Sequence, residues 1–314
     1  MSEILKLKPA FKDYLWGGQY LKKKYCVCDM EKVAEAWVLS THRDGHSIVC
    51  GGRYDGMTLS EAVANMGDTA LGSKAAAFEM FPQMIKIIDA EQSLSLQVHP
   101  SDEYALKNEG QYGKTEMWYI LDAKEGAGIY YGVKEEITKE QLKNAIATNT
   151  VEDILNFAPC TAGESYFIPS GTLHAIGAGL LIAEVQQNSN VTYRVYDYGR
   201  VGADGKPREL HIEKALKVSD LSPVKAEAEK TSVKKDDADL TTLSRCPYFT
   251  AVKAVVNGNY RITPKDSFMS VLITKGDGEI DGKPFSLFDT FFIPADTHSV
   301  TLSGDFEAVI TYCE

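Results

Sequence analysis

The chain has 314 residues, and its 33 basic and 44 acidic side chains give it a formal net charge of −11. This length is enough for about two domains, and a composition of 44% hydrophobic and 25% charged residues is typical of a globular protein. The acidic excess disfavours a nucleic-acid-binding protein and a protein that docks on anionic membranes, because both need a basic surface.

Short helices and many short strands are predicted along the chain. Apolar spacing and capping residues predict helices, and Thr138 with Gln141 forms a start signal for one of them. Alternating apolar and polar residues between Gly, Pro and Asp predict the strands. The expected helices lie at 58–66, 72–80, 138–157 and 209–218, and the expected strands at 84–99, 115–122, 164–169, 180–187 and 191–197.

A change in composition suggests where the domains divide. Residues 222–241 are rich in Lys, Glu, Asp, Ala and Thr, and we interpret them as a solvated connector. The strand-rich block 246–314 follows. We therefore expect a domain at 1–235, with a helical insertion near 138–157, and a smaller β domain at 236–314. Many strands with peripheral helices favour a mainly β protein with a barrel or jelly-roll core.

The segment from Ser93 to Pro100 has the most informative pattern in the chain. Because strand side chains alternate, Ser93, Ser95, Gln97 and His99 share one face and the apolar residues between them share the other. A polar row of this kind suits a barrel interior that holds a ligand. A half-exposed sheet edge is the alternative interpretation.

Two further segments add candidate metal ligands. Glu116 lies in an apolar strand, where a carboxylate is costly to bury unless it is paired or binds metal. His174 follows a Pro-x-Gly turn at the mouth of a strand pair. With Gln97 and His99 they form an N/O donor set for a divalent metal, which suits catalytic zinc, although manganese, iron or cobalt would also fit.

Ionisable residues continue on the next two predicted strands. Glu184 and Gln186 share one face, and Arg194 and Tyr196 share another. Such a dense polar row in a β core is unusual for a purely structural strand. We interpret Asp197 and Arg200 as a structural ion pair.

In these segments the chain resembles the type I mannose-6-phosphate isomerases in their short bacterial form. The resemblance runs in order over roughly residues 10–210 and is most specific around His99, Glu116 and His174. It rests on the segments Trp16-Gly17-Gly18, Ala34-Glu35-Ala36-Trp37, Pro82 to Lys86, Leu94 to Pro100, Lys114 to Trp118, and His174 to Arg200. Longer members of the family have a histidine where this chain has Gly113, so any role of that histidine is not carried over.

The resemblance implies a fold and a set of functional residues. The fold is cupin-like, with a degenerate cupin barrel at the C-terminus. One zinc ion per chain is implied, and Arg194 matches the arginine assigned to catalysis. The implied zinc ligands are Gln97, His99, Glu116 and His174, and the positions that line the substrate pocket are Lys86, Ser95 and Lys114, with Arg194 as a further substrate contact.

The implied reaction is the interconversion of mannose 6-phosphate and fructose 6-phosphate through an enediol(ate). This chemistry needs an electrophile, a base near C1 and C2, and a cationic clamp for the phosphate. We favour Glu184 as the base, because a carboxylate in a dry pocket can have a suitably raised pKa, and Lys114 is the alternative. Arg194 would stabilise the enediolate or clamp the phosphate.

Two other functions remain open at this point. One is a different cupin metalloenzyme, such as an oxygenase or another sugar-phosphate isomerase, and the other is a non-catalytic sugar-binding cupin. No membrane-length apolar segment, signal peptide or zinc-knuckle cysteine pattern is found, and the six scattered cysteines suit a reducing cytoplasm. We expect a cytoplasmic enzyme with a small-molecule substrate and no nucleic-acid or membrane partner, and a monomer is favoured.

Overall fold

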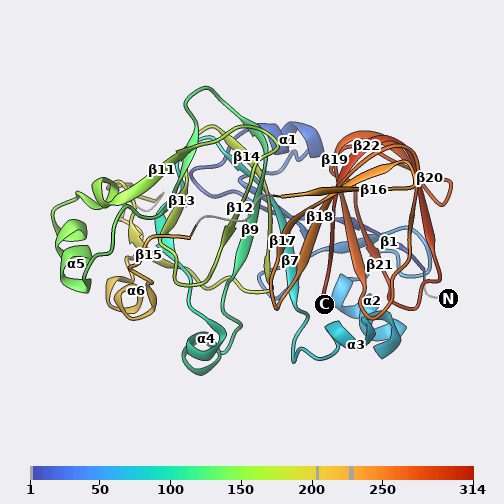
Figure 1. Ribbon diagram of the computed structural model, residues 1–314, viewed down its shortest axis with the longest axis horizontal. Helices are drawn as coiled ribbons and strands as arrows, with labels where there is room; N and C mark the ends of the chain where they lie inside the picture. The colour runs from blue at the N-terminus through green and yellow to red at the C-terminus, as the bar shows by residue number, and fades with distance from the viewer. Residues whose placement is uncertain (1–2, 203–204, 226–229) are drawn as a thin grey trace. The chain divides into compact units, whose positions relative to one another are not determined.

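The computed structural model describes residues 3–202, 205–225 and 230–314. Strands dominate it and the helices are short, so the mainly β class is confirmed (Figure 1). Within the described residues, no helix has the length and apolar character needed to cross a membrane.

The chain forms two compact units, and each is assembled from separate segments. Unit 1 comprises the described residues of 1–10, 37–86 and 228–314, and unit 2 those of 11–36 and 87–227. Strands β2, β3 and β7 contain residues of both units. The division at residue 235 that the sequence suggests is retained as a proposal about domain organisation.

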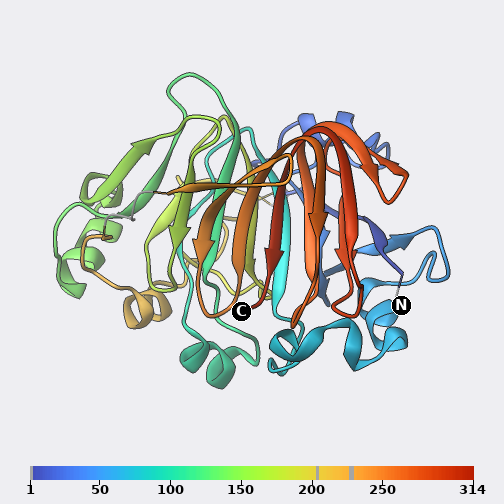
Figure 2. The same ribbon diagram turned by 45° about the vertical axis from the view of Figure 1, so that its right-hand side comes forward.

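A nine-stranded antiparallel sheet forms most of unit 1. The strand order is β16-β17-β18-β22-β19-β21-β1-β6, and β20 pairs with β19. The long strands β18, β19 and β22 come forward in orange and red in Figure 2. Its strands are β1 (Leu5–Lys8), β6 (Ile48–Cys50), β16 (Ser232–Lys235), β17 (Ala238–Arg245), β18 (Thr250–Ile262), β19 (Met269–Ile280), β20 (Lys283–Phe285), β21 (Thr290–Ile293) and β22 (Val300–Tyr312).

Unit 2 contains a five-stranded sheet with the order β11-β10-β13-β8-β15. One face of this sheet packs on a core that includes Leu96, Val98 and Leu173. The middle strand β8 is short, and it pairs with a strand on each side. The strands are β8 (Leu96–Val98), β10 (Gly128–Val133), β11 (Leu155–Pro159), β13 (His174–Ile176) and β15 (Tyr193–Tyr196).

A six-stranded sheet has the order β12-β9-β14-β7-β3-β2. Strand β9 is central to the site because Glu116 begins it and pairs with Gln186 of β14. A two-stranded hairpin of β4 (Thr41–His42) and β5 (Gly45–His46) is separate. The strands of the six-stranded sheet are β2 (Ala10–Lys12), β3 (Glu35–Leu39), β7 (Gln83–Ala90), β9 (Glu116–Ala123), β12 (Ser165–Ile168) and β14 (Leu180–Gln187).

The helices are short, and capping residues explain where several of them begin. Thr58 and Thr138 each form a reciprocal capping box with the residue three positions later, so α2 and α5 begin where the sequence predicts. Helices α5 and α6 lie beside the five-stranded sheet in Figure 1. The helices are α1 (Tyr20–Tyr25), α2 (Leu59–Met66), α3 (Gly72–Ala75), α4 (Asp102–Glu109), α5 (Lys139–Ala147) and α6 (Ile212–Val218), with 3-10 turns η1 (Asp68–Ala70) and η2 (Val151–Ile154).

Three predicted helices are longer in the prediction than in the structure. The helix expected at 72–80 ends at Ala75, and the one expected at 209–218 begins at Ile212. The stretch 138–157 contains α5 and η2 but then enters strand β11 at Leu155. A left-handed Asn149 follows α5, which explains why the helix does not continue.

The prediction of a connector at 222–241 is wrong for the residues that form β16 and the start of β17. All four residues of β16 are exposed, so no apolar alternation marks the strand, and only its pairing with β17 defines it. Residues 226–229 of this stretch lie outside the described part of the chain.

Candidate metal centre

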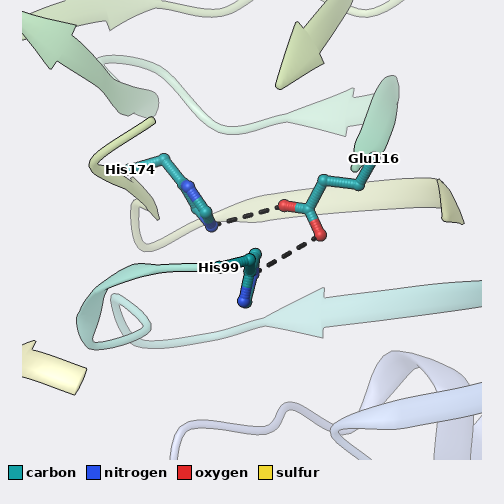
Figure 3. Close-up of side chains that lie close together, drawn as sticks. All are labelled: His99, Glu116 and His174. Atoms are coloured by element: carbon teal, nitrogen blue, oxygen red, sulfur yellow. Dashed lines mark ion pairs between the residues drawn. The ribbon is translucent and has the colours of Figure 1, made fainter. Parts of the chain in front are cut away.

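Three buried side chains meet in unit 2, each at the end of a strand. His99 directly follows β8, Glu116 begins β9 and His174 begins β13. Their nitrogen and oxygen atoms all lie within 4.8 Å of one another. Figure 3 shows both histidine rings turned toward the Glu116 carboxylate. Two sheets therefore bring together three metal-ligating groups that are far apart in the sequence.

The separations between these atoms fit a single small ion. Nε2 of His174 lies 3.3 Å from Oε1 of Glu116, and Nε2 of His99 lies 3.6 Å from Oε2 (Figure 3). Two ligand atoms that are each about 2.0–2.2 Å from a tetrahedral zinc ion are about 3.3–3.6 Å apart. The donor set therefore matches a tetrahedral divalent cation.

Backbone carbonyl groups orient both imidazole rings. Nδ1 of His99 lies 2.8 Å from the carbonyl oxygen of Val191, and Nδ1 of His174 lies 2.8 Å from that of Thr172. A carbonyl accepts hydrogen bonds only, so each Nδ1 carries the proton and each Nε2 presents a lone pair to the site. Burial, followed by the positive charge of Lys114, lowers the pKa of His174 to about 4, which keeps this ring neutral at neutral pH.

Gln97 lies beside this group on the central strand of its sheet. Its amide nitrogen is 3.4 Å from Nε2 of His174, and the two residues are directly paired between β8 and β13. Rotation of the amide by a half turn would present Oε1 at the same place, and such amide orientations are assigned from the hydrogen-bond network. Gln97 is thus positioned as a fourth donor.

The ammonium group of Lys114 lies between two carboxylates, next to His99. Its ammonium group contacts Oε2 of Glu116 and lies 3.5 Å from Oε1 of Glu184. It also lies 3.3 Å from Nε2 of His99. Lys114 is 4% exposed, Glu116 0% and Glu184 3%. This group of two carboxylates and one ammonium ion has an excess negative charge, which a divalent cation would offset.

Trp118 holds the second of these carboxylates. Its indole Nε1 donates a 2.9 Å hydrogen bond to Oε2 of Glu184, and the two residues are directly paired between β9 and β14. The ring also packs edge-on against His174, with centroids 5.3 Å apart. The same tryptophan therefore contacts a candidate base and a candidate metal ligand.

The predicted substrate-binding residues divide between the two units. In unit 2, Nε of Arg194 donates a 3.2 Å hydrogen bond to Oγ of Ser95. In unit 1, Lys86 is buried, and its ammonium group lies 5.0 Å from the ring centroid of Trp37. Lys86 therefore lies in the interior of the protein and not on its surface.

A partly buried hydrogen-bond network positions the segment that precedes Glu116. Oδ1 of Asp102 accepts hydrogen bonds from the backbone N–H of Gly113, at 2.7 Å, and from Nε2 of Gln187, at 2.8 Å. Oε1 of Gln187 accepts a 2.9 Å bond from the backbone N–H of Thr115. The backbone N–H of Lys114 donates to the carbonyl of Pro100 at 3.1 Å. These hydrogen bonds hold residues 113–115 against residues 100–102. His99 directly precedes one of these segments, and Glu116 directly follows the other.

Gly113 has no room for a side chain within this network. A Cβ atom there would lie 2.5 Å from the carbonyl carbon of Ser101, 2.6 Å from the nitrogen of Asp102 and 2.6 Å from the carbonyl oxygen of Pro100. Backbone fills the space that a side chain would need, which explains why this position is glycine here.

The variant Gly113→Ala is expected to lower both activity and stability. The added methyl group must push the segment 100–102 away, and this segment adjoins His99. Overpacking of this kind costs about 1–3 kcal/mol, and thermal unfolding measures it. Ser101→Ala is the control, because this exposed side chain makes no capping hydrogen bond, so it should unfold like the wild type. An unfolding midpoint of Gly113→Ala equal to that of the control would contradict the argument.

The structure brings together most of the residues that the sequence singled out. Gln97, His99, Lys114, Glu116, His174 and Glu184 form one group. Ser95, directly before β8, is hydrogen-bonded to Arg194 of the adjacent strand β15. Trp118 is a buried core residue, and it lies two positions after Glu116 in β9, so both side chains share one face of the strand. Gln187 and Asp102 had no signal in the sequence, because their contacts are with residues distant along the chain.

The mainly β fold and the buried His-Glu-His group define a candidate metalloenzyme. A family model described as the catalytic domain of type I phosphomannose isomerase matches residues 4–143, and one described as the cupin domain of mannose-6-phosphate isomerase matches residues 239–313. The chain is 36% identical to the mannose-6-phosphate isomerase ManA of Bacillus subtilis, over 99% of both chains. It is 35% identical to a mannose-6-phosphate isomerase of Streptococcus mutans, also over 99% of both. The chain therefore belongs to the type I phosphomannose isomerase family.

Solved structures agree with this assignment and confirm the cupin fold. The crystal structure of the mannose 6-phosphate isomerase from Bacillus subtilis superposes with a TM-score of 0.91 at 34% identity, covering 99% of both chains. The mannose 6-phosphate isomerase from Salmonella typhimurium superposes with a TM-score of 0.76 at 18% identity, covering all of both chains, and this match supports the fold alone.

Proposed function

We propose that this chain is a zinc-dependent aldose-ketose isomerase that interconverts mannose 6-phosphate and fructose 6-phosphate. The observation that supports this most directly is the buried group of His99, Glu116 and His174 with Lys114 and Glu184 beside it. This group occurs in a chain whose sequence is similar, over 99% of its length, to proteins named as mannose-6-phosphate isomerases. A metal site next to a paired acid and amine is suited to moving a proton between adjacent carbons.

Gln97, His99, Glu116 and His174 would hold one zinc ion per chain. Two neutral imidazoles with fixed tautomers and one carboxylate are donors that zinc prefers, and the ligand spacing fits a tetrahedral ion. When bound, the ion supplies Lewis acidity at the carbonyl end of the sugar. The negative charge of this group supports binding of a cation over binding of a neutral ligand.

Glu184 is proposed as the general base that takes the C2 proton. Trp118 fixes one of its oxygen atoms, and the other faces the ammonium group of Lys114. Glu184 thus holds the proton at Oε1, on the side of Lys114, and returns it to C1 of the enediolate. Lys114 is the alternative proton carrier, because its ammonium group contacts both carboxylates.

The remaining proposed substrate contacts are Arg194, Ser95, Lys114 and Lys86. Arg194 would offset the negative charge of the enediolate or bind the phosphate, and Ser95 orients its guanidinium group. Lys86 is proposed to line the substrate pocket because the resemblance to type I mannose-6-phosphate isomerases implies this role. We also propose a cytoplasmic, monomeric enzyme, and the free state of all six cysteines supports a reducing compartment.

A comparison of two sugars tests the proposal. We expect turnover of mannose 6-phosphate to fructose 6-phosphate, with a kcat/KM for free mannose lower by roughly 100-fold or more, because charge-assisted hydrogen bonds to the phosphate are lost. The measurement is isomerisation of each sugar by the zinc-loaded protein, followed by chromatography of the products. Similar kcat/KM values would refute a phosphate clamp, and oxygen consumption without isomerisation would favour an oxygenase instead.

A further inference from the structure

Three arginines gather around one buried carboxylate at the end of β15. Asp197 is 5% exposed, and both of its oxygen atoms accept hydrogen bonds from Arg208, at 2.5 and 2.7 Å. Arg200 donates a further 2.5 Å bond to Oδ1. Burial alone would raise the pKa of Asp197, but these hydrogen bonds lower it, so the carboxylate stays ionised. Together with the nearby Arg194, this arginine cluster has two positive charges in excess.

The three guanidinium groups differ in how many of their donors are used. All three guanidinium nitrogen atoms of Arg200 donate hydrogen bonds, two to Asp197 and one to the carbonyl of Ser93, so we interpret Arg200 as a structural residue. Arg194 uses Nε and Nη1, for Ser95 and the carbonyl of Glu209. Arg208 uses Nε and Nη2, both for Asp197. Among the described residues, none accepts a hydrogen bond from Nη2 of Arg194 or Nη1 of Arg208.

The arginine cluster stands at a defined distance from the candidate metal ligands. Gln97 is paired directly with His174 on one side and with Arg194 on the other. Directly paired residues point to the same face of a sheet, and neighbouring strands are about 4.8 Å apart. The backbone of Arg194 is therefore two strand spacings, about 10 Å, from that of His174. A ligand along this face would place one end near the metal ligands and the other at the arginines.

Charge favours the same ligand orientation. Glu116 and Glu184 give the metal-ligand end an excess negative charge, and an anion would be repelled there unless a metal is bound. The arginine end has excess positive charge, and its side chains are only partly exposed, so their interactions are weakly screened. Arginine donors of this kind match the oxygen atoms of a phosphate group, to which they bind in pairs.

We propose that Arg208, oriented by Asp197, binds the phosphate of the substrate together with Arg194. Arg208 is thus a specificity-determining residue for phosphate monoesters, and Asp197 is a positioning residue that acts through it. The assignment rests on the proposed isomerase function for the identity of the substrate. It places the phosphate contact away from Lys114, whose ammonium group is engaged by two carboxylates.

Binding of a non-reacting ligand pair tests this subsite independently of catalysis. Glucitol 6-phosphate and glucitol differ only in the phosphate, and neither contains a carbonyl group. We expect Arg208→Met in the metal-loaded protein to raise the Kd of glucitol 6-phosphate by roughly tenfold to a hundredfold, the effect of one or two lost charge-assisted hydrogen bonds. The Kd of glucitol should be unchanged. Isothermal titration calorimetry measures both constants.

Kinetics and two companion variants complete the test. For mannose 6-phosphate, Arg208→Met should raise KM far more than it lowers kcat. Arg208→Lys should recover part of this loss, because lysine restores the positive charge but not the paired hydrogen bonds of a guanidinium group. Arg245→Met is the control, an exposed arginine paired with Glu314 in unit 1. If Arg208→Met fails to fold, the Kd of Arg208→Lys for glucitol 6-phosphate decides whether Arg208 binds the phosphate. Unchanged glucitol 6-phosphate affinity in the folded variants would overturn the subsite, whereas a wild type that binds this ligand but does not isomerise would overturn the proposed function alone.

Discussion

Replacing His99 with alanine should abolish metal binding and isomerase activity together. The imidazole of His99 is held in a fixed tautomer by the Val191 carbonyl, and its Nε2 lies 3.6 Å from Oε2 of Glu116. Loss of even the groups that orient a metal ligand costs 10- to 100-fold in metal affinity or activity. Loss of the ligand itself should therefore cost more than about 100-fold. Metal content is measured by elemental analysis of the dialysed protein, and activity by formation of fructose 6-phosphate.

The matched control is His298→Ala, which removes an exposed histidine in unit 1. It should retain about one equivalent of zinc and full activity. Thermal unfolding adds a readout that does not depend on catalysis, because a ligand that binds only the folded state raises the midpoint. Zinc should raise the midpoint of the chelated wild type and of the control, and it should leave that of His99→Ala unchanged. A fully active chelated wild type would contradict the metal assignment.

The variant Glu184→Gln should lower kcat by about 10²–10⁴-fold, the usual contribution of a general base, while KM changes little. Glutamine has the same shape and can still accept the hydrogen bond from Trp118, so the fold around the site should persist. In deuterated water the wild type should place deuterium at C1 of fructose 6-phosphate, because the base exchanges its proton with solvent. Mass spectrometry of the product measures the incorporated fraction, and partial incorporation is sufficient in so buried a site.

The exposed carboxylate Glu213 provides the control, and Glu213→Gln should behave as the wild type. If the C2 hydrogen is fully retained and Glu184→Gln keeps a nearly normal kcat, a hydride shift replaces proton transfer and Glu184 is not the base. If deuterium is incorporated but Glu184→Gln remains active, Lys114 is the better assignment for the proton carrier.

The strands that form the site could be predicted because polar and apolar side chains alternate along them, although both faces of β9 and β13 are buried at the site. Period-two alternation placed Gln97 with His99, and the structure brings both side chains to the site. The exposed strand β16 was missed for the opposite reason, since neither of its faces is buried. Pairing across the sheet also overrides a local preference: Asn257-Gly258, a dipeptide typical of tight turns, lies within β18, where Gly258 pairs with Gly304.

Contacts between distant segments could not be predicted from local patterns. Asp197 and Arg200 are close in sequence and were expected to pair, which the structure confirms. Arg208 reaches the same carboxylate from 11 positions later, across a connection that has no periodicity to reveal the direction of its side chains. The contact of Gln187 with Asp102 spans 85 positions and depends on the register of β14 against β9.

The pairing of β1 has a consequence for how the protein is made. Strand β1 is hydrogen-bonded to β6 on one edge, and its other edge pairs with β21, which begins at Thr290. At a synthesis rate of about 5–20 residues per second, this edge waits on the order of half a minute for its partner. During that time Leu5 and Leu7, both buried in the finished unit, lie on an unpaired strand edge of the nascent chain. Production of this protein should therefore depend on chaperones that shield nascent chains, and truncation before Thr290 should yield aggregates.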